Sequence, residues 1–350
     1  MHECNETYRD TPALTVAADV QVTQVGDIAS KPLDYAVCIP ARNEEQAIGA
    51  TLDALGAAMA DHRGTGCVVL AINDTADRTA SIAHGWAQAR GIPTLIARFD
   101  LPIAERTAPR TRRIAMDLGQ RLVPGGTLLT TDADTLVERG WIARNLAKLS
   151  CGADLVCGQI ALDPDELAVL PRRVHRIGAA EAEFFALTEE LWHRWTGSAE
   201  PLHIRASGAS LALRTETYGA VGGLPTPPFA EDKALCALVR GHGYTAIALD
   251  MPDTVSSARL WGRAANGCGH ALRQRMQEAD PPCDELLLPL GMLARIAARC
   301  RQVSVPVAYS GYLAAREALA KDVPRMAYSD VVRELAMHRH HRDEAARAEL

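Results

Sequence analysis

The chain has 350 residues, of which 48% are hydrophobic, 23% charged and 5% aromatic, and its formal net charge is −6. This composition is that of an ordinary globular protein, and the length allows one large domain or two small ones around a sizeable core. The negative balance argues against a protein that binds nucleic acid by neutralising phosphates, so we expect no nucleic-acid partner.

The sequence contains no window of 18 uninterrupted apolar residues, which predicts no integral membrane segment. The first thirty residues lack the apolar stretch of a signal peptide. The nine cysteines are scattered and odd in number, and none has the close-set partners of a zinc site. We therefore expect a cytoplasmic protein with reduced thiols.

Residues 1–33 show no steady period, and we expect a leader that is partly disordered or draped on the domain. From Tyr35 onward, apolar strands alternate with amphipathic helices. Strands are predicted at 35–41, 67–73, 92–100 and 126–134, and helices around 48–59, 79–90 and 114–122. Gly91 is the expected C-cap of the second helix. This alternation predicts an α/β fold with a mostly parallel sheet and helices on both faces.

After residue 134 the pattern loosens. It predicts strands at 154–163, 207–216 and 245–250, a long helical stretch at about 165–195, and a helix from Glu231. Beyond Pro281 the chain is predicted to be helical with no cluster of chemical residues. We therefore divide it into a leader (1–33), an α/β domain (34–280) and a helical C-terminal extension (281–350).

Polar residues follow three of the predicted strands, and ligands of such sheets bind outside the carboxyl ends of the strands. These residues are Asn43 and Glu44, Asn73 and Asp74, and Asp132 and Asp134. A candidate site at this rim is the hypothesis, although strands also end in polar loops for no functional reason.

Asp132 and Asp134 stand one residue apart in "TTDADT". On an extended turn alternate side chains point the same way, so both carboxylates can reach one hard divalent cation. Mg²⁺ or Mn²⁺ held in this way keeps positions open for diphosphate oxygens. The alternative is a solvated turn, because this short pattern is common by chance.

Four segments in order strengthen the first interpretation: "AVCIPARNEEQAIGATLDAL", "DTADRTASIA", "TTDADT" and "PFAEDKAL". Together, from about residue 35 to 280, they resemble the family 2 glycosyltransferases, which have the GT-A fold with its Rossmann-like nucleotide-binding sheet. The segment "SGASLALRTETYGAVGG" is similar to the one before that family's catalytic acid. The Q-x-x-R-W signature of processive members is absent, which favours a soluble, non-processive transferase.

The resemblance implies a role for each matching position. Pro40, Ala41, Asn43 and Glu44 would lie against the nucleoside of a UDP- or GDP-sugar, and Asn73 or Asp74 would contact its base. The family more often has two aspartates there, so the base stays open. Asp132 and Asp134, with Ala133 between them, would hold Mn²⁺ or Mg²⁺ on the diphosphate. Some GT-A enzymes use a late histidine, and His270 would complete the metal site in that case. The alternative is an ordinary surface or core histidine.

The resemblance also makes Asp232, in the pair Glu231–Asp232, the general base. Transfer with inversion needs a base on the sugar face opposite the leaving diphosphate, and a carboxylate distant in sequence can supply it. Acidic residues at a helix start also complement the helix dipole, which is the structural alternative.

Arginines concentrate in "RTAPRTRRIAMDLG", ahead of the two aspartates. In the family this region often carries a basic residue near the donor phosphates, and guanidinium groups suit phosphate oxygens. Arg113 is our candidate for that contact. A solvated arginine-rich face is the alternative.

Two rival enzyme classes fit poorly. Haloacid dehalogenase phosphatases need Thr or Val two places beyond the second aspartate, where Leu136 stands. Nucleotidyltransferases need a Gly-rich, Arg-containing first loop, where "IPARNEE" stands. We expect an inverting, metal-dependent hexosyltransferase that acts on a small-molecule or lipid-head acceptor. The alternative is a non-catalytic nucleotide-binding scaffold, and homo-oligomerisation stays open.

Overall fold

The computed structural model describes residues 17–28, 32–262, 267–304 and 306–348. Its contacts divide the chain into two compact units. The first comprises Met1–Glu166, Ile204–Ala258 and Arg263–Gly267, and the second comprises Leu167–His203, Arg259–Gly262 and Cys268–Leu350. The stretch 167–203, which we placed in the α/β domain, is thus grouped with the C-terminal helices. Within the described ranges, no helix is both long and apolar enough to cross a bilayer.

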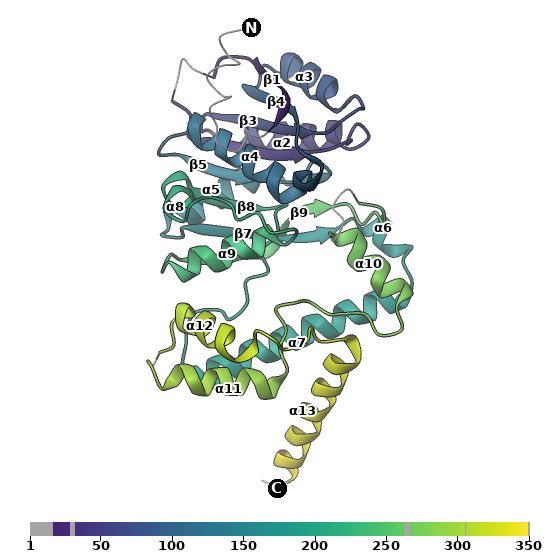
Figure 1. Cartoon of the computed structure of the whole chain (residues 1–350), viewed down its shortest axis with the longest axis vertical. Coiled ribbons are helices and arrows are strands. Elements are labelled where there is room, and N and C mark those ends of the chain that lie inside the picture. Colours follow the sequence, from purple (N-terminus) through teal and green to yellow (C-terminus); the bar gives the residue numbers. More distant parts are fainter. Residues whose placement is uncertain (1–16, 29–31, 263–266, 305, 349–350) are drawn as a thin grey trace. The chain divides into compact units, whose positions relative to one another are not determined.

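A nine-stranded sheet forms the centre of the first unit (Figure 1). The strands are β1 (Ala18–Val25), β2 (Tyr35–Ala41), β3 (Gly66–Asn73), β4 (Thr94–Asp100), β5 (Thr127–Thr130), β6 (Thr135–Val137), β7 (Leu155–Leu162), β8 (Leu211–Arg214) and β9 (Ala246–Ser256). Their order is β1-β4-β3-β2-β5-β8-β7-β9-β6. Strands β2, β3, β4, β5, β7 and β9 run in one direction, and β1, β6 and β8 run against their neighbours. The expected mostly parallel α/β sheet is confirmed.

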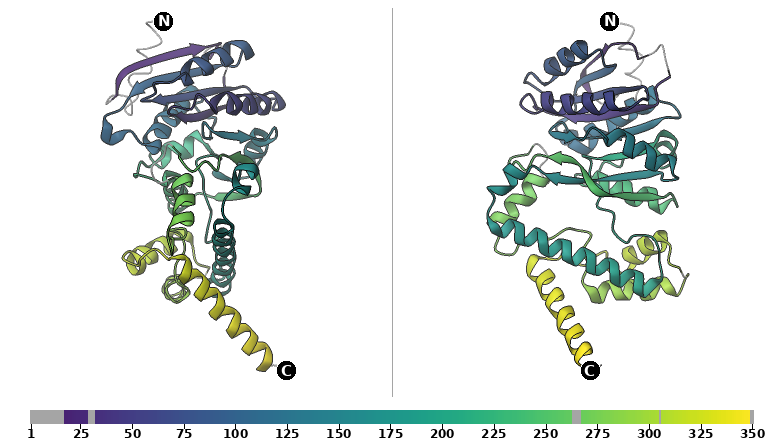
Figure 2. Two further views of the ribbon diagram at one scale, coloured as in Figure 1. Left: turned by 90° about the vertical axis from the view of Figure 1, so that its right-hand side faces the viewer. Right: turned by 180° about the vertical axis from the view of Figure 1, so that it is seen from behind.

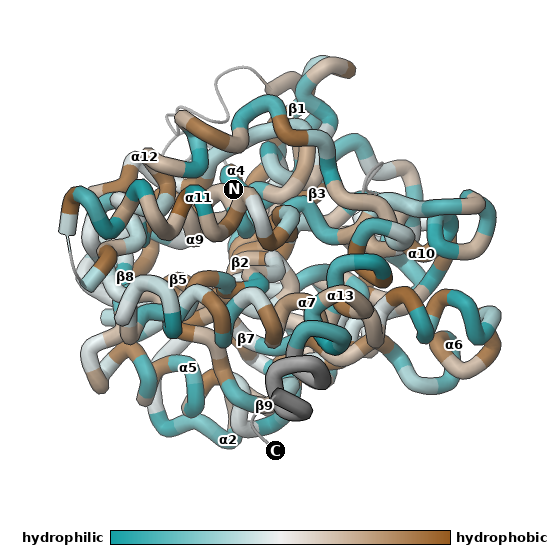
Figure 3. Tube along the Cα trace, turned by 90° about the horizontal axis from the view of Figure 1, so that it is seen from below, coloured by the Kyte–Doolittle hydropathy of each residue, from teal (hydrophilic) through white to brown (hydrophobic). Residues whose placement is uncertain are grey.

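Helices cover both faces of this sheet because the strands are apolar on both sides. They are α2 (Ile48–Asp61), α3 (Thr79–Arg90), α4 (Ala108–Leu122), α5 (Trp141–Ser150), α8 (Thr215–Ala220) and α9 (Glu231–Gly241). On β2, Ala36 and Cys38 belong to a buried cluster with α4, whereas Val37 and Ile39 belong to a second cluster with α2. Figure 3 shows hydrophobic residues around β2 and β5 in the middle of the view.

Local signals explain several boundaries. Helix α3 ends at Gly91, whose φ of 63° is left-handed, so the predicted C-cap is confirmed. Helix α4 begins after Thr107, whose side chain accepts a hydrogen bond from the backbone N–H of Arg110, and Pro109 lies in its first turn. Part of the predicted leader is regular: Ala18–Val25 forms β1, antiparallel to β4, while residues 1–16 lie outside the described ranges.

The second unit contains α7 (Arg172–Thr196), α10 (Cys268–Gln277), α11 (Leu290–Arg301), α12 (Tyr309–Ala320) and α13 (Tyr328–Ala348). The helical stretch predicted at 165–195 is interrupted, because α6 (Pro164–Ala168) ends before Pro171 and α7 begins after it. Helix α7 packs against α11 and α13. Figure 2 shows these helices from two further directions. Trp192 of α7 joins Ile296 and Tyr312 in one of the two cores of this unit.

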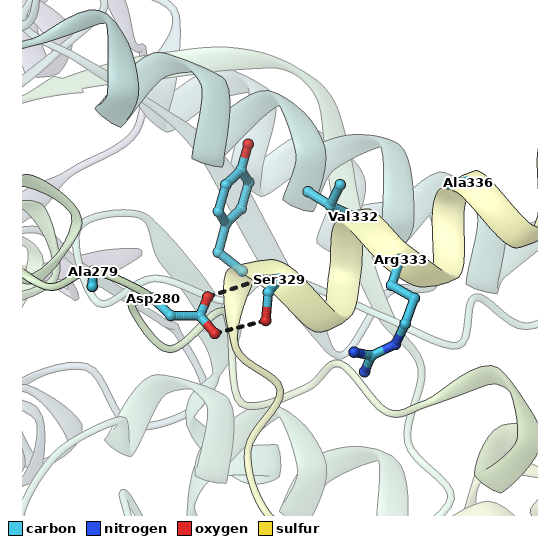
Figure 4. A pocket seen from close by; sticks show the side chains of 7 residues that line it. Ala279, Asp280, Ser329, Val332, Arg333 and Ala336 are labelled. Atoms are coloured by element: carbon cyan, nitrogen blue, oxygen red, sulfur yellow. Dashed lines mark hydrogen bonds between the residues drawn. The ribbon is translucent and has the colours of Figure 1, made fainter.

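A pocket in the second unit is lined by residues in the first turns of α13 and by Ala279 and Asp280, which follow α10 (Figure 4). Its carboxylate, Asp280, accepts hydrogen bonds from the backbone N–H and the hydroxyl of Ser329, at 2.8 and 2.6 Å. These bonds stabilise the first turn of α13. We therefore assign Asp280 a structural role in the second unit.

Candidate active site at the carboxyl ends of the strands

The order of the strands reverses at β2. Strands β3 and β4 follow on one side of it, and β5 lies on the other. Such a reversal of strand order opens a crevice at the carboxyl ends of the strands, where ligands of open α/β sheets bind. Every site residue predicted between Pro40 and Asp134 lies in the first unit at the end of β2, β3 or β5, or on α4.

Two loops on this rim, after β2 and after β3, are joined by hydrogen bonds. The backbone N–H of Asn43 donates to Thr75 Oγ1 at 3.2 Å, and Asn43 Oδ1 accepts from the N–H of Ala76 at 3.0 Å. The backbone N–H of Glu44 donates to Thr79 Oγ1 at 2.8 Å, and the Glu44 residue is buried. Asn43 and Glu44 thus fix the loop geometry through backbone and side-chain contacts. Pro40 and Ala41 are the last residues of β2, where Pro40 is half-buried and Ala41 is buried.

Asp74 is the charged residue of the second loop. It has a φ of 45°, a left-handed conformation that Asp tolerates better than most residues. Its Oδ2 accepts from Arg42 at 2.5 Å and its Oδ1 from Arg106 at 2.8 Å. All three side chains stay partly exposed, at 24%, 41% and 31% for Asp74, Arg42 and Arg106. This edge therefore offers both hydrogen-bond donors and acceptors to a ligand.

Asn73 differs from Asp74, because only 1% of it is exposed. Its Nδ2 donates to Thr111 Oγ1 at 3.3 Å, and its Oδ1 accepts from the N–H of Leu101 at 3.1 Å. These contacts join β3 to α4 and to the segment after β4. Of the two residues considered for the base contact, Asp74 is the one whose side chain reaches the surface.

The two aspartates of the motif lie in the turn between β5 and β6, since β5 ends at Thr130. Asp132 and Asp134 are half-buried, and the carbonyl of the buried Ala133 accepts from Thr51 Oγ1 at 2.9 Å. The turn is therefore anchored to α2 at Ala133, while the carboxylates on both sides keep partial exposure.

Arg112 is the centre of the candidate site. Its Nη2 donates to Asp132 Oδ1 at 2.5 Å, and its Nε donates to Glu231 Oε1 at 3.0 Å. Its Nη1 donates to Thr130 Oγ1 and to the carbonyl of Gly208, both at 2.8 Å. Burial alone lowers the pKa of this guanidinium, but the carboxylates of Asp132 and Glu231 outweigh it and raise the pKa above its ordinary value. Arg112 therefore stays charged.

The sequence predicts the phosphate contact at the neighbouring residue, Arg113. Arg113 donates to both oxygens of Asp117 at 3.0 Å and to the carbonyl of Leu224 at 2.7 Å. Its guanidinium carbon lies 6.0 Å from the centre of the Tyr218 ring. The helical period indicates that Arg112 is the buried arginine. It precedes the buried Met116 by four residues and so lies on the face of α4 that packs on the sheet. Phosphate binding by Arg113 stays a prediction.

Glu231 and Asp232 begin α9 and have different surroundings. Glu231 is buried and bonded to Arg112, whereas Asp232 is half-buried. Asp232 Oδ2 accepts from the N–H of Gly208 at 2.9 Å, and its Oδ1 accepts from the N–H of Lys233 at 2.7 Å. Burial, followed by the negative charge of Glu231, raises the pKa of Asp232 to about 6. A carboxylate of this pKa is mostly ionised at neutral pH and more basic than an ordinary aspartate.

The backbone before these acids is under strain. Ala230 has a φ of 59° and a ψ of 39°, a left-handed conformation that costs a non-glycine residue about 1–2 kcal/mol. Gly208 makes a close approach, because a Cβ there would come within 2.5 Å of the guanidinium carbon of Arg112. Unfavourable backbone geometry is concentrated at functional sites, where surrounding contacts maintain it.

The donor set fits a hard divalent cation. Asp132 and Asp134 are partly exposed carboxylates one residue apart, and such oxygen donors are the ligands that a hard divalent cation prefers. Thr131 Oγ1, beside these aspartates, is buried without a hydrogen-bond partner in the structure as described. Within the described ranges, no group of three or more His, Cys, Asp or Glu side chains is arranged to hold a metal ion. Two aspartates would leave the other positions to diphosphate and water. His270 lies on α10 of the second unit, and its metal role stays a prediction.

A second buried acid was not predicted from the sequence. Asp253 of β9 is 1% exposed and accepts from Ser210 Oγ at 3.3 Å and from Asn145 Nδ2 at 3.4 Å. Burial raises its pKa to about 6. Because its carboxylate is shielded from solvent, we assign it to the support of β8 and β9 rather than to ligand contact.

Comparison with known proteins identifies a family for part of the chain. Residues 36–199 match the model of glycosyl transferase family 2. The family predicted from the ordered motifs is thereby confirmed for these residues. No curated protein matches the sequence significantly.

Among solved structures, the mannosyltransferase PcManGT from Pyrobaculum calidifontis, in complex with GDP-Man and Mn²⁺, is 18% identical. The match covers 96% of this chain and 81% of that one, with a TM-score of 0.50. S. aureus TarS 1–349 in complex with UDP-GlcNAc is 13% identical, with a TM-score of 0.47, and covers 67% of this chain. The match spans only 61% of the TarS chain. At 18% identity the likeness to PcManGT shows the fold alone, and it supports the predicted GT-A architecture.

Proposed function

We propose, from the premise that residues 36–199 belong to glycosyl transferase family 2, that this chain transfers a hexosyl group from a nucleotide-sugar to a hydroxyl acceptor. One observation supports this proposal above the others. Arg112 joins Asp132, at the end of β5, to Glu231, at the start of α9. A candidate donor aspartate and the pair that holds a candidate base therefore belong to one hydrogen-bonded network, although about a hundred residues separate them.

The donor would occupy the rim between the loops after β2, β3 and β5. Asp74, with Arg42 and Arg106 fixed on it, would contact the base, because these polar side chains are partly exposed there. Pro40, Ala41, Asn43 and Glu44 would form the wall against the nucleoside. Both UDP- and GDP-sugars fit this arrangement, since Asp74 can accept from the N–H of either base and the arginines can donate to its carbonyl groups.

Asp132 and Asp134 would hold Mn²⁺ or Mg²⁺ on the diphosphate. The cation, when bound, would neutralise charge that grows on the departing diphosphate. Asp232 would accept the proton of the acceptor hydroxyl at its carboxylate while the oxygen attacks the anomeric carbon. The bond from this carbon to the diphosphate breaks, and the configuration inverts because base and leaving group lie on opposite faces.

Glu231 has a different part in this scheme. It is buried and already bonded to Arg112, so it holds the guanidinium rather than removing a proton. In the same scheme the acceptor is a small molecule or a lipid head group. The protein would act in the cytoplasm. Among the described residues all eight cysteines are free thiols, which fits that compartment.

The test is turnover of nucleotide-sugars. Purified chain is incubated with UDP- and GDP-hexoses and Mn²⁺, and release of the nucleoside diphosphate is measured for the wild type and for Asp232→Asn. We expect release for one donor and a loss of about 10²–10⁴-fold in the variant, the usual effect of losing a general base. Binding of a nucleotide without any release would favour the scaffold instead, and equal rates in both proteins would exclude Asp232 as the base.

A further inference from the structure

We propose that Arg112 is the positioning residue of this site: through Gly208 it sets the place of Asp232 relative to Asp132. The inference rests on the proposed function and concerns a residue that makes no contact with substrate in that scheme. Its basis is a continuous path of hydrogen bonds across three separate segments of the first unit.

The path begins at Asp132 Oδ1, which accepts from Arg112 Nη2 at 2.5 Å. Arg112 Nη1 then donates to the carbonyl oxygen of Gly208 at 2.8 Å. The backbone N–H of the same Gly208 donates to Asp232 Oδ2 at 2.9 Å. One residue of the loop before β8 thus contacts Arg112 with its carbonyl and Asp232 with its amide, so a displacement of the guanidinium would be passed to the candidate base.

Only an arginine can make all these contacts. The four acceptors on Thr130, Asp132, Gly208 and Glu231 use three different nitrogens of one planar guanidinium, and lysine has a single nitrogen. The side chain of Arg112 is 5% exposed, so water cannot replace a lost contact easily. A lysine would keep the positive charge but lose most of the fixed geometry.

Gly208 provides independent support for this role. A Cβ at residue 208 would come within 2.5 Å of both the guanidinium carbon and Nη2 of Arg112, and within 2.8 Å of Nε. The residue is buried and lies in the segment before β8. The loop therefore depends on a residue without a side chain so that its peptide can lie against the guanidinium.

Glu231 completes the arrangement. Its Oε1 accepts from Arg112 Nε at 3.0 Å, a nitrogen that bonds neither Asp132 nor Gly208. Removing Arg112 would leave Glu231 buried without its cation, which is strongly destabilising in general. A variant that lacks the charge can therefore fail to fold, and the test needs a partner substitution.

The experiment compares Arg112→Lys, Arg112→Met, Glu231→Gln and the double variant Arg112→Met/Glu231→Gln, which removes both buried charges. Arg90→Met is the matched control, because Arg90 on α3 bonds the carboxylate of Asp53 on the surface. Two readouts are used: kcat and KM for the donor identified by turnover, and the titration of Asp232 in full-length protein with ¹³C-carboxyl-labelled aspartate, assigned with Asp232→Asn.

We expect Arg112→Lys to lower kcat about 10²-fold with little change in KM, since misplacement of a reacting group by about 1 Å has this effect. In the folded double variant, Asp232 should titrate at a different pH from that in Glu231→Gln alone, which already lacks the charge of Glu231, and Arg90→Met should match the wild type in both readouts. An unchanged kcat in Arg112→Lys, or an Asp232 titration in the double variant that matches Glu231→Gln, would overturn the proposal. If no donor is turned over, the proposed function fails, and the titration alone still decides the role of Arg112.

Discussion

Replacement of Asp232 by asparagine should stabilise the protein while it removes activity. Burial, with the charge of Glu231, raises the pKa of Asp232 from 3.8 to about 6. One pKa unit corresponds to about 1.36 kcal/mol, so the charged carboxylate costs the folded state about 3 kcal/mol above pH 7. Asparagine has one carbonyl acceptor for the two backbone N–H groups of Gly208 and Lys233, and loss of one such bond costs about 1 kcal/mol. We therefore expect a net gain of about 2 kcal/mol at pH 8.

The pH dependence has a definite sign. A carboxyl group whose pKa is raised by folding stabilises the native state while it is protonated, and this contribution is lost as the pH rises from about 4 through about 6. Asp232→Asn lacks this dependence. The stability difference between variant and wild type should therefore be close to zero or negative at pH 4.5 and become positive above pH 6.

The assay is urea unfolding followed by tryptophan fluorescence between pH 4.5 and 8. Asp53→Asn serves as the control, because it makes the same chemical change at an exposed carboxylate that pairs with Arg90 on the surface. A difference between Asp232→Asn and wild type that stays constant with pH would refute the reasoning. So would a variant that is less stable than wild type at pH 8.

Three further predictions concern the same site. Turnover should fall about tenfold for each pH unit below about 6, because the base must be ionised, and kcat/KM measured from pH 4.5 to 8 checks this. Gly208→Ala should lower kcat about 10²-fold, since the added Cβ displaces Arg112; steady-state rates that match the wild type would contradict it. Asn73→Ala should lower the free energy of unfolding by about 1–3 kcal/mol, because the buried N–H of Leu101 loses its acceptor, whereas Asp74→Asn should leave it nearly unchanged and alter nucleotide preference. Urea unfolding measures the stability of both variants, and competition binding measures the nucleotide preference of Asp74→Asn.

The strand and helix pattern from residue 35 to 134 was predictable because both signals are local. β2 is apolar at every position and buried on both faces, and Gly91 ends α3 where the helical period stops. Strand direction is a different matter. The apolar run that forms β8 has the composition of its neighbours, and only the packing of distant segments makes it antiparallel to β5 and β7. Proline at residue 171 is by itself sufficient to predict the interruption of the long helix there.

The candidate site could also be predicted only in part, because some of its contacts join segments that are distant in the sequence. Asp132, Glu231 and Asp232 could be selected because motif order indicates them, and the structure joins the first two through Arg112. The choice between Arg112 and Arg113 depends on one residue of helical register, about 100° of rotation. The buried role of Asn73 depends on contacts with Leu101 and Thr111, which belong to two other segments and leave no trace in local spacing.

The most direct test of the proposed donor site is a thermal-shift screen of UDP, GDP, CDP and dTDP, each with and without Mn²⁺, on the wild type and on Asp134→Ala. A nucleotide that binds only the folded state raises the melting temperature by mass action. The account predicts that one diphosphate stabilises the wild type when Mn²⁺ is present and that Asp134→Ala loses this shift. Equal stabilisation of both proteins would contradict the assignment of the two aspartates, and no shift with any millimolar nucleotide would contradict the donor site itself.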